Sequence, residues 1–203
     1  MTWNVKHSTP TGDIVETVQA LIRGHGLDVV CLQELAPLSV VPPRCSARRA
    51  LAFATRWNLA FACHPHLFPG WIEGVAVLSR LPIVARRRTL LSSRRSYLQV
   101  AIRHEALSAV SIGAIHLSTP DRRARELRTA LARSSCERCV MAGDFNLRLG
   151  DRAMDAATER YQPDGIPGVD HVLISHDLRF VDRGRVRAAA SDHDPVIATV
   201  AAA

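Results

Sequence analysis

Apolar residues follow two patterns along this chain, one typical of helices and the other of buried strands. Between residues 11 and 22, apolar side chains recur every three or four positions after a Thr-Gly-Asp helix start, and Gly24 and Gly26 end the pattern. Over residues 121–133, Ala and Leu form an apolar stripe while arginines crowd the other face. Both segments are therefore predicted to be amphipathic helices.

Short apolar runs, many of them rich in β-branched residues, predict strands that are covered on both faces. Such runs occur at residues 2–5, 27–32, 59–63, 74–78, 97–102, 108–115, 139–142, 169–174 and 196–200. They alternate with helices too irregularly for a parallel barrel, and no repeat, low-complexity tract or linker divides them. The pattern favours a single, layered α/β domain that spans residues 1–203.

The composition is that of an ordinary globular domain. Of the 203 residues, 47% are apolar and 22% are charged, which argues against a disordered, collagen-like or membrane protein. No apolar run reaches the roughly eighteen residues of a transmembrane helix. Because residues 2–5 begin a strand rather than a secretory signal, we expect a cytoplasmic protein without a membrane span, and a monomer.

Charge is the unusual feature of the composition. The formal net charge of +7 and the pI of 9.9 favour an anionic partner such as nucleic acid, a phosphorylated metabolite or an anionic lipid. Lys6 is the only lysine among the 26 basic residues, so part of this excess reflects a general preference for arginine. Arginine clusters at residues 86–88, 94–95 and 122–123 are candidate polyanion contacts, although solvated arginine faces are common.

The cysteines do not suggest a disulfide framework, because they are five in number and scattered. Cys136 and Cys139 form a lone CxxC pair without the second pair of ligands that a structural zinc usually needs. Cys139 also begins an apolar run. We therefore interpret this pair as packing residues.

Polar residues suited to catalysis stand at the ends of the predicted strands. Any one of them is most simply a helix cap, a buried amide or a surface histidine. Layered folds, however, gather catalytic side chains from distant positions at strand ends. The positions are Asn4, Gln33-Glu34, His116, Asp144-Phe145-Asn146, Asp170-His171 and Asp192-His193.

Seven motifs, taken in order, give the chain a family resemblance. They are Thr2-Trp3-Asn4-Val5, Leu32-Gln33-Glu34, Gly74-Val75-Ala76-Val77-Leu78-Ser79-Arg80, Ile115-His116-Leu117, Gly143-Asp144-Phe145-Asn146, Asp170-His171-Val172 and Ser191-Asp192-His193. With them the sequence resembles the endonuclease/exonuclease/phosphatase superfamily, in its histidine-containing, deoxyribonuclease-like branch. The resemblance covers residues 2–200. It implies a four-layer α/β sandwich, with two mixed sheets packed face to face, helices outside and the site at one end.

The resemblance implies a metal-dependent phosphoester hydrolase. Glu34 is the expected principal ligand of Mg²⁺, with Mn²⁺ as an alternative ion, and Asn4 beside it would hold the metal or a phosphate oxygen. Asp192 is the candidate second ligand. Hard oxygen ligands of this kind suit Mg²⁺, which bridges to a substrate phosphate.

Catalytic roles are implied in the same way. Asp144 would orient or deprotonate the attacking water, and Asn146 would hydrogen-bond the phosphate. Asp170 resembles the carboxylate that pairs with the final histidine, His193, fixing its tautomer and favouring its charged form.

Three further positions carry alternatives. His116 takes the place of the first family histidine, which is tyrosine in abasic-site endonucleases. Glu73 resembles the glutamate that pairs with this histidine, or is a charged residue at a strand start. Arg125 resembles an arginine that many members keep, either as a substrate contact or in an ion pair with a carboxylate.

The expected function is a nuclease-like phosphodiesterase, with a phosphoester such as nucleic acid as substrate. The short segment between Asn146 and Asp170 predicts an open site, and the inositol phosphatase signature is absent from the residues before His171. A lipid or small-molecule phosphoesterase remains an alternative. A non-catalytic member that binds nucleic acid is disfavoured, because the metal glutamate and both histidines are present.

Overall fold

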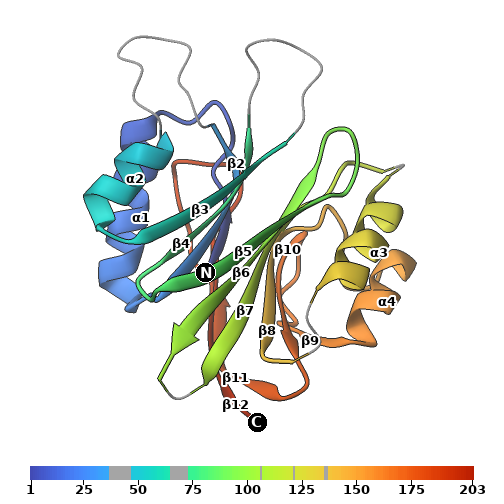
Figure 1. Cartoon of the computed structure of the whole chain (residues 1–203). Helices are drawn as coiled ribbons and strands as arrows, with labels where there is room; N and C mark the ends of the chain where they lie inside the picture. The colour runs from blue at the N-terminus through green and yellow to red at the C-terminus, as the bar shows by residue number, and fades with distance from the viewer. Residues whose placement is uncertain (37–46, 65–72, 106, 121, 135–136) are drawn as a thin grey trace.

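The computed structural model describes residues 1–36, 47–64, 73–105, 107–120, 122–134 and 137–203. Within them, two mixed β-sheets of six strands each pack face to face, and helices cover the outer faces (Figure 1). One sheet has the order β11-β12-β1-β2-β4-β3, with strands β1 (Thr2–Asn4), β2 (Val29–Leu35), β3 (Asn58–Cys63), β4 (Gly74–Ser79), β11 (Leu178–Arg185) and β12 (Val196–Ala202). The other has the order β5-β6-β7-β8-β10-β9, with strands β5 (Ile83–Leu90), β6 (Ser96–His104), β7 (Ser108–His116), β8 (Cys139–Asp144), β9 (Tyr161–Pro163) and β10 (Asp170–Ser175).

The helices form the two outer layers. In Figure 1, α1 (Thr11–His25) and α2 (Ala47–Thr55) cover the first sheet, while α3 (Arg123–Arg133) and α4 (Asp155–Thr158) cover the second. The 3₁₀ turn η1 (Arg152–Met154) directly precedes α4. Buried apolar side chains of the described residues form one cluster between the sheets and one under each helical layer. The four-layer α/β sandwich expected from the sequence is thus confirmed.

The apolar stripe of α1 explains why this helix lies where it does. Ile14, Val18 and Leu21 are buried against the sheet, as the helical spacing predicts. The helix ends at Gly26, which has a left-handed backbone (φ 59°) and donates its N–H to the carbonyl of Ile22. The second predicted helix is also present, as α3, although residue 121 at its expected start lies outside the described residues.

The strands that the apolar pattern did not predict include two exposed edge strands. β5 and β11 each end a sheet, and most of their residues are exposed, so neither contains an apolar run. The arginine cluster at residues 86–88 lies on β5. Charged side chains on an edge strand hinder its pairing with another chain, which gives this cluster a structural explanation.

Strand direction and register bring the catalytic motifs to one end of the sandwich. β1 and β2 are parallel, as are β7 and β8, with Asn4 opposite Gln33 and His116 opposite Asp144. β10 is antiparallel to β8, so Asp170 at its start lies opposite Asp144 at the end of β8. Residues from five strands therefore meet at the same end of the two sheets.

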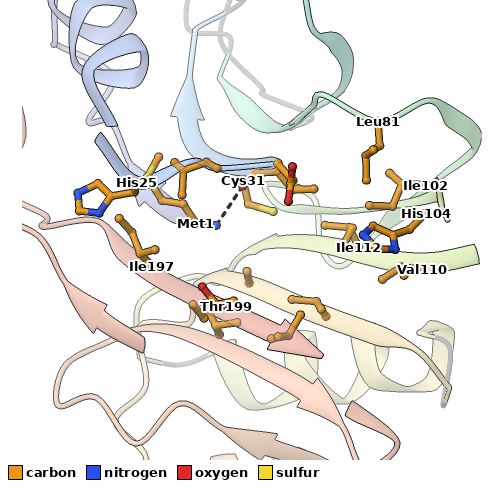
Figure 2. A pocket seen from close by; sticks show the side chains of 18 of the residues that line it. Met1, His25, Cys31, Leu81, Ile102, His104, Val110, Ile112, Ile197 and Thr199 are labelled. Carbon is orange, nitrogen blue, oxygen red and sulfur yellow. Dashed lines mark hydrogen bonds between the residues drawn. The ribbon is translucent and has the colours of Figure 1, made fainter. Parts of the chain in front are cut away.

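The other end of the sandwich contains a cavity. Side chains of both sheets line a partly open pocket of about 210 Å³ near the starts of β2, β7 and β8, with Cys31, Ile102, Val110 and Ile197 in the wall (Figure 2). Val172 is the one motif residue that lines this space, and none of the candidate site residues does. The cavity is therefore separate from the predicted site.

The composition also led to expectations about membrane-spanning helices and about the cysteines. No helix of the described residues is long and apolar enough to cross a membrane. Among the described residues, no disulfide joins Cys31, Cys63 or Cys139, and Cys139 is buried in β8, as expected for a packing residue. Its CxxC partner Cys136 lies outside the described residues.

Candidate active site

The aspartate-histidine pair predicted from the last two motifs is formed. Nδ1 of His193 lies 2.8 Å from Oδ2 of Asp170, which is buried at the start of β10. This hydrogen bond raises the pKa of His193 to about 9, against the opposing effect of burial. The imidazole is therefore cationic at neutral pH.

The loop that carries His193 is fastened to β1. Nε1 of Trp3 donates to the carbonyl of His193 (3.0 Å), and Oγ of Ser191 donates to the carbonyl of Asn4 (2.8 Å). The N–H of His193 in turn donates to Oγ of Ser191. The first and last motifs are thus held together across nearly the whole sequence.

Asp144 occupies the centre of the site. It is buried at the end of β8, and burial together with the nearby charge of Asp170 raises its pKa to about 6. The N–H of Asn146 donates to its Oδ1 (2.8 Å), which partly offsets this rise. A carboxylate with such a pKa can accept a proton near neutral pH.

Asn4 bridges two carboxylates rather than presenting its oxygen to them. Its Nδ2 donates to Oε1 of Glu34 (3.2 Å) and to Oδ2 of Asp144 (3.1 Å), and its Oδ1 accepts the N–H of Lys6 (3.0 Å). The backbone donor of Lys6 fixes the amide in this orientation. In this arrangement the amide oxygen of Asn4 faces the backbone of Lys6, and its amide nitrogen suits a carboxylate or phosphate oxygen.

Glu34 stands on an irregular part of β2. The register with β4 shifts between Leu32 and Leu35, and Glu34 has a left-handed backbone (φ 55°). Its Oε2 accepts the N–H of His7 (3.1 Å) and lies 3.0 Å from His7 Nδ1. Burial alone would raise the pKa of Glu34, but these hydrogen bonds and that from Asn4 lower it below its usual value.

His116 is buried in a different environment from His193. Its Nε2 lies 3.6 Å from Oδ2 of Asp144 and 3.9 Å from Oε1 of Glu34, and its Nδ1 has no hydrogen-bond partner among the described residues. Burial lowers its pKa well below the usual value, and the charges of Arg95 and of neighbouring histidines add to this. The ring is therefore neutral at neutral pH.

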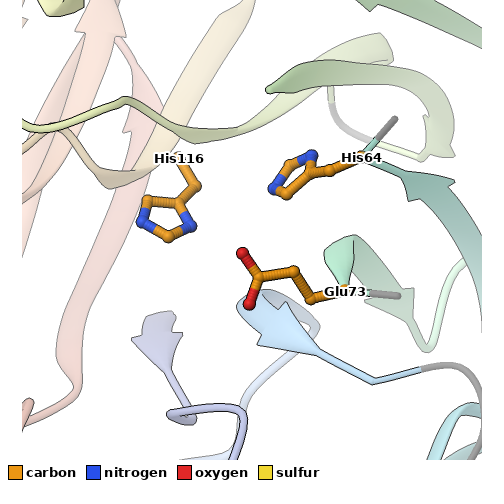
Figure 3. Close-up of side chains that lie close together, drawn as sticks. All are labelled: His64, Glu73 and His116. Atoms are coloured by element: carbon orange, nitrogen blue, oxygen red, sulfur yellow. The ribbon is translucent and has the colours of Figure 1, made fainter. Parts of the chain in front are cut away.

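Glu73 lies near His116 but does not form the expected direct pair with it. Oε1 of Glu73 accepts a hydrogen bond from Nη1 of Arg95 (2.9 Å), and the carboxylate is almost fully buried. Among the described residues, no ion pair joins Glu73 to His116, although a carboxylate oxygen and a ring nitrogen approach within 4.8 Å (Figure 3). Arg95, which the sequence placed in a basic surface cluster, is the direct partner of Glu73.

Asp192 and Arg125 lie apart from the other candidates. Asp192 is exposed and pairs with Nζ of Lys6 (2.8 Å), so it does not join the converging carboxylates among the described residues. Arg125 is exposed on α3, and no carboxylate of the described residues pairs with it. Arg123 instead donates from Nη1 to the carbonyl of Asn146.

Asn146 and the end of β7 are held by the same helix. Nδ2 of Asn146 donates to the carbonyl of Leu117 (2.8 Å), and Asn146 has a left-handed backbone (φ 49°). Both carboxylate oxygens of the buried Glu126 on α3 accept hydrogen bonds from Ser118. These contacts fix the two loops that follow His116 and Asp144.

Sequence reasoning gave no site role to Lys6, His7 or His64, and it considered Arg95 and Arg123 only as members of basic surface clusters. His64 follows the predicted strand 59–63 directly, so the rule applied to the other strand ends would have identified it. The other four carry no distinctive signal. Their roles depend on contacts with residues far away in the sequence.

The donor set is consistent with a divalent cation. Carboxylate oxygens of Glu34 and Asp144 share the amide of Asn4, and Oδ1 of the buried Asp170 has no hydrogen-bond partner among the described residues. The charge of Asp170 also raises the pKa of Asp144, which shows that the carboxylates repel one another. A hard cation such as Mg²⁺ would relieve this repulsion.

Fold and donor set together define the class of two-sheet α/β phosphoesterases. Residues 1–193 match the profile of the Endonuclease/Exonuclease/phosphatase family, and the chain therefore belongs to this family of phosphoester hydrolases and nucleases. No sequence among curated proteins matches the chain.

Solved structures repeat the fold. The endonuclease/exonuclease/phosphatase from Beutenbergia cavernae matches with a TM-score of 0.83 at 23% identity, over 99% of this chain and 70% of that one. D. rerio TDP2 complexed with single-strand DNA product matches with a TM-score of 0.73 at 13% identity, over 98% and 97% of the two chains. Sphingomyelinase C from Streptomyces griseocarneus matches with a TM-score of 0.66 at 16% identity, over 97% of each chain. At such identities the similarity is one of fold.

Proposed function

We propose that this chain is a Mg²⁺-dependent phosphodiesterase of the nuclease type, with Mn²⁺ as an alternative ion. The observation that carries the proposal is the buried Asp170–His193 pair at 2.8 Å, beside the converging carboxylates of Asp144 and Glu34. A cationic donor next to a carboxylate that can accept a proton is the combination that attack of water on a phosphoester requires.

Glu34 would hold the cation, with Oδ1 of Asp170 as the second ligand, which leaves Asp144 to accept a proton. A bound divalent ion would supply Lewis-acid stabilisation of charge on a phosphoryl oxygen. Asp192, which pairs with Lys6 at the surface, is not part of this set. Asn4 would keep Glu34 and Asp144 at a fixed separation through its amide group.

The chain's own side chains would divide the remaining work. His193, held cationic by Asp170, donates a hydrogen bond to a non-bridging phosphate oxygen. Asp144, with its pKa of about 6, takes a proton from the attacking water. Asn146 keeps one amide hydrogen on the carbonyl of Leu117 and can direct the other to the phosphate. Neutral His116 completes the site on the side of Glu34.

Nucleic acid is the substrate that we favour. The net charge of +7 and the arginines of β5 favour a polyanion, and TDP2, which has the same fold, was solved with a single-strand DNA product. A lipid or small phosphoester is the alternative, because sphingomyelinase C also shares the fold. A non-catalytic role would require that the buried aspartate-histidine pair serve stability alone.

Hydrolysis of a chromogenic phosphodiester with Mg²⁺, and with EDTA, tests the proposal. We expect activity that EDTA abolishes and that His193→Ala lowers by roughly 10²- to 10⁴-fold. A folded protein without Mg²⁺-dependent turnover on this compound, on single-stranded and duplex DNA, on RNA and on sphingomyelin would refute it. Among active substrates, binding that weakens steeply with salt identifies a polyanion, whereas a flat dependence identifies a small phosphoester.

A further inference from the structure

A third histidine lies behind His116. His64 follows β3, its side chain is only 1% exposed, and its ring centroid is 6.0 Å from that of His116. Figure 3 shows the two rings and the carboxylate of Glu73 turned toward one another. Each of the three side chains offers an atom within 4.8 Å of the other two. Three buried polar groups therefore converge on one small volume.

The backbone fixes the tautomer of His64. Its Nδ1 lies 3.0 Å from the amide nitrogen of Ser96 in β6. A backbone amide can only donate, so Nδ1 accepts, and the neutral ring carries its proton on Nε2. Oγ of Ser96 donates to the carbonyl of Cys63, which holds the two strands in this relation.

This tautomer decides what the cluster can bind. Two histidines and a glutamate are a common set of zinc ligands, but a metal ion needs a lone pair on the coordinating nitrogen. Nε2 of His64 presents a hydrogen instead. Glu73, held in place by Arg95, presents only acceptors, and Nδ1 of His116 has no partner among the described residues. A group that both accepts and donates hydrogen bonds satisfies all three.

We propose that His64, Glu73 and His116 hold one water molecule between them. A point central to three atoms that lie within 4.8 Å of one another is at most about 2.8 Å from each, which is hydrogen-bond distance. The water oxygen accepts from Nε2–H of His64, and its two hydrogens go to Glu73 and to Nδ1 of His116. Such a water makes the three hydrogen bonds that are usual for a buried site.

The consequence is a fixed tautomer for His116. Because Nδ1 accepts from the water, the proton of the neutral ring resides on Nε2, which faces Asp144 and Glu34 at the reaction centre. The Ser96 amide makes His64 a donor at one end of this series. At the other end, the carboxylates of Asp144 and Glu34 can only accept, which favours the proton on Nε2 of His116. His64 is thus a positioning residue that makes His116 a donor toward the substrate, a role that rests on the proposed function.

Two substitutions separate this role from mere packing. In His64→Asn the side-chain oxygen can still accept the Ser96 N–H, but the side chain is too short to reach the water. In His64→Gln the amide N–H takes the place of Nε2–H, so the water keeps its donor. The two variants differ in which end of the imidazole they replace.

Nitrogen NMR of the histidine rings in metal-free protein provides the decisive measurement, with the signal of His116 assigned by its loss in His116→Gln. We expect the wild-type signal to show the proton on Nε2, and His64→Asn to shift it toward the other tautomer, while His64→Gln leaves it close to wild type. A wild-type proton on Nδ1, or an unchanged tautomer in His64→Asn, would overturn the proposal. This readout stands even if the chain hydrolyses no phosphoester.

Kinetics provide the second measurement. Loss of a group that orients a site histidine typically costs about 10- to 100-fold, so kcat of His64→Asn should fall by this factor with little change in KM. His64→Gln should recover most of the loss. Equal kcat values for the two variants would contradict the positioning role. They would show that the loss of activity does not depend on an N–H donor toward the water.

Discussion

At the residue scale, the two site histidines have opposite electrostatic environments. His193 touches a buried carboxylate at hydrogen-bond distance and is held cationic, whereas His116 is buried without such a partner and is held neutral. The sequence had suggested the same arrangement for both, since each has a candidate carboxylate. The difference arises because Glu73 pairs with Arg95 instead of His116. The two rings therefore suit different tasks, one as a cation and the other as a neutral donor.

The raised pKa of His193 predicts a pH dependence of stability in metal-free protein. Because the folded pKa of about 9 lies above the usual 6.5, the contribution is complete below about pH 6.5 and is lost as the pH rises through 9. A quarter of the side chain is exposed, so after screening we expect roughly 1 to 2 kcal/mol. Urea unfolding of wild type and His193→Gln at pH 6 and pH 10 measures it. A stability difference that grows toward pH 10 would contradict this sign.

Glu34 is the residue whose removal should abolish the response to metal. With Mg²⁺ at about 100 times its dissociation constant, binding to the native state alone stabilises a protein by about 2.7 kcal/mol. Glu34→Gln should lose this rise in the unfolding temperature together with the activity. Asp192→Asn is the matched control and should keep both, because Asp192 pairs with Lys6 at the surface. The reverse result would reinstate Asp192 as a ligand and exclude Glu34.

At the scale of elements, close packing of strand ends determines where the catalytic groups stand. Ile115 of β7 lies opposite Gly143 of β8, one position before His116 and Asp144. A Cβ atom at Gly143 would overlap the carbonyl oxygen of Ile115. The glycine of the Gly-Asp-Phe-Asn motif is therefore needed for the approach of the two strands, not for turn geometry.

Gly143→Ala should accordingly destabilise the fold by about 1 to 3 kcal/mol, the usual cost of overpacking, and should displace Asp144. Urea unfolding gives the first quantity, and kcat on the chromogenic diester reports the second. Gly24→Ala serves as the control of opposite sign. Nothing lies within 4 Å of a Cβ at this position in α1, so alanine should add up to about 1 kcal/mol. Equal effects of the two substitutions would disprove the packing explanation.

At the scale of the whole molecule, the sandwich is packed unevenly along its length. The catalytic end is filled by buried polar groups, while the opposite end contains the cavity of about 210 Å³ shown in Figure 2. Where apolar side chains such as Ala142 border unfilled space, they lack dispersion contacts, which costs stability. The cavity and the site are at opposite ends, so changes at the cavity should affect stability alone.

Ala142→Val should therefore raise stability by roughly 0.5 to 1 kcal/mol, since Ala142 lines the cavity and a larger side chain can grow into it. Ala114, its direct neighbour on β7, is buried but does not line the cavity. Ala114→Val should destabilise by overpacking. Urea unfolding measures the stability of both variants. If both substitutions destabilise the protein, the cavity does not provide room for a larger side chain.

Sequence alone determined most of the fold. Buried strands and amphipathic helices bury apolar side chains, and this burial leaves a period that can be read without the structure, as for α1 and β4. The exposed edge strands β5 and β11 were not predicted, because most of their side chains face solvent and leave no apolar pattern. The short helix α2 was not predicted either, because only Ala47 and Leu51 are buried and two positions do not make a helical pattern.

For the site, the sequence supplied the inventory and the tertiary structure decided the pairings. Glu34, Asp144, Asp170, His116 and His193 converge because strand ends meet, which motif order already implied. Which group touches which could not be read from that order. Hydrogen-bond and charge partners lie far apart in the sequence and are chosen by geometry at the level of a few tenths of an ångström. Only the tertiary structure therefore shows that Glu73 pairs with Arg95, that Asp192 pairs with Lys6, and that His64 lies beside His116.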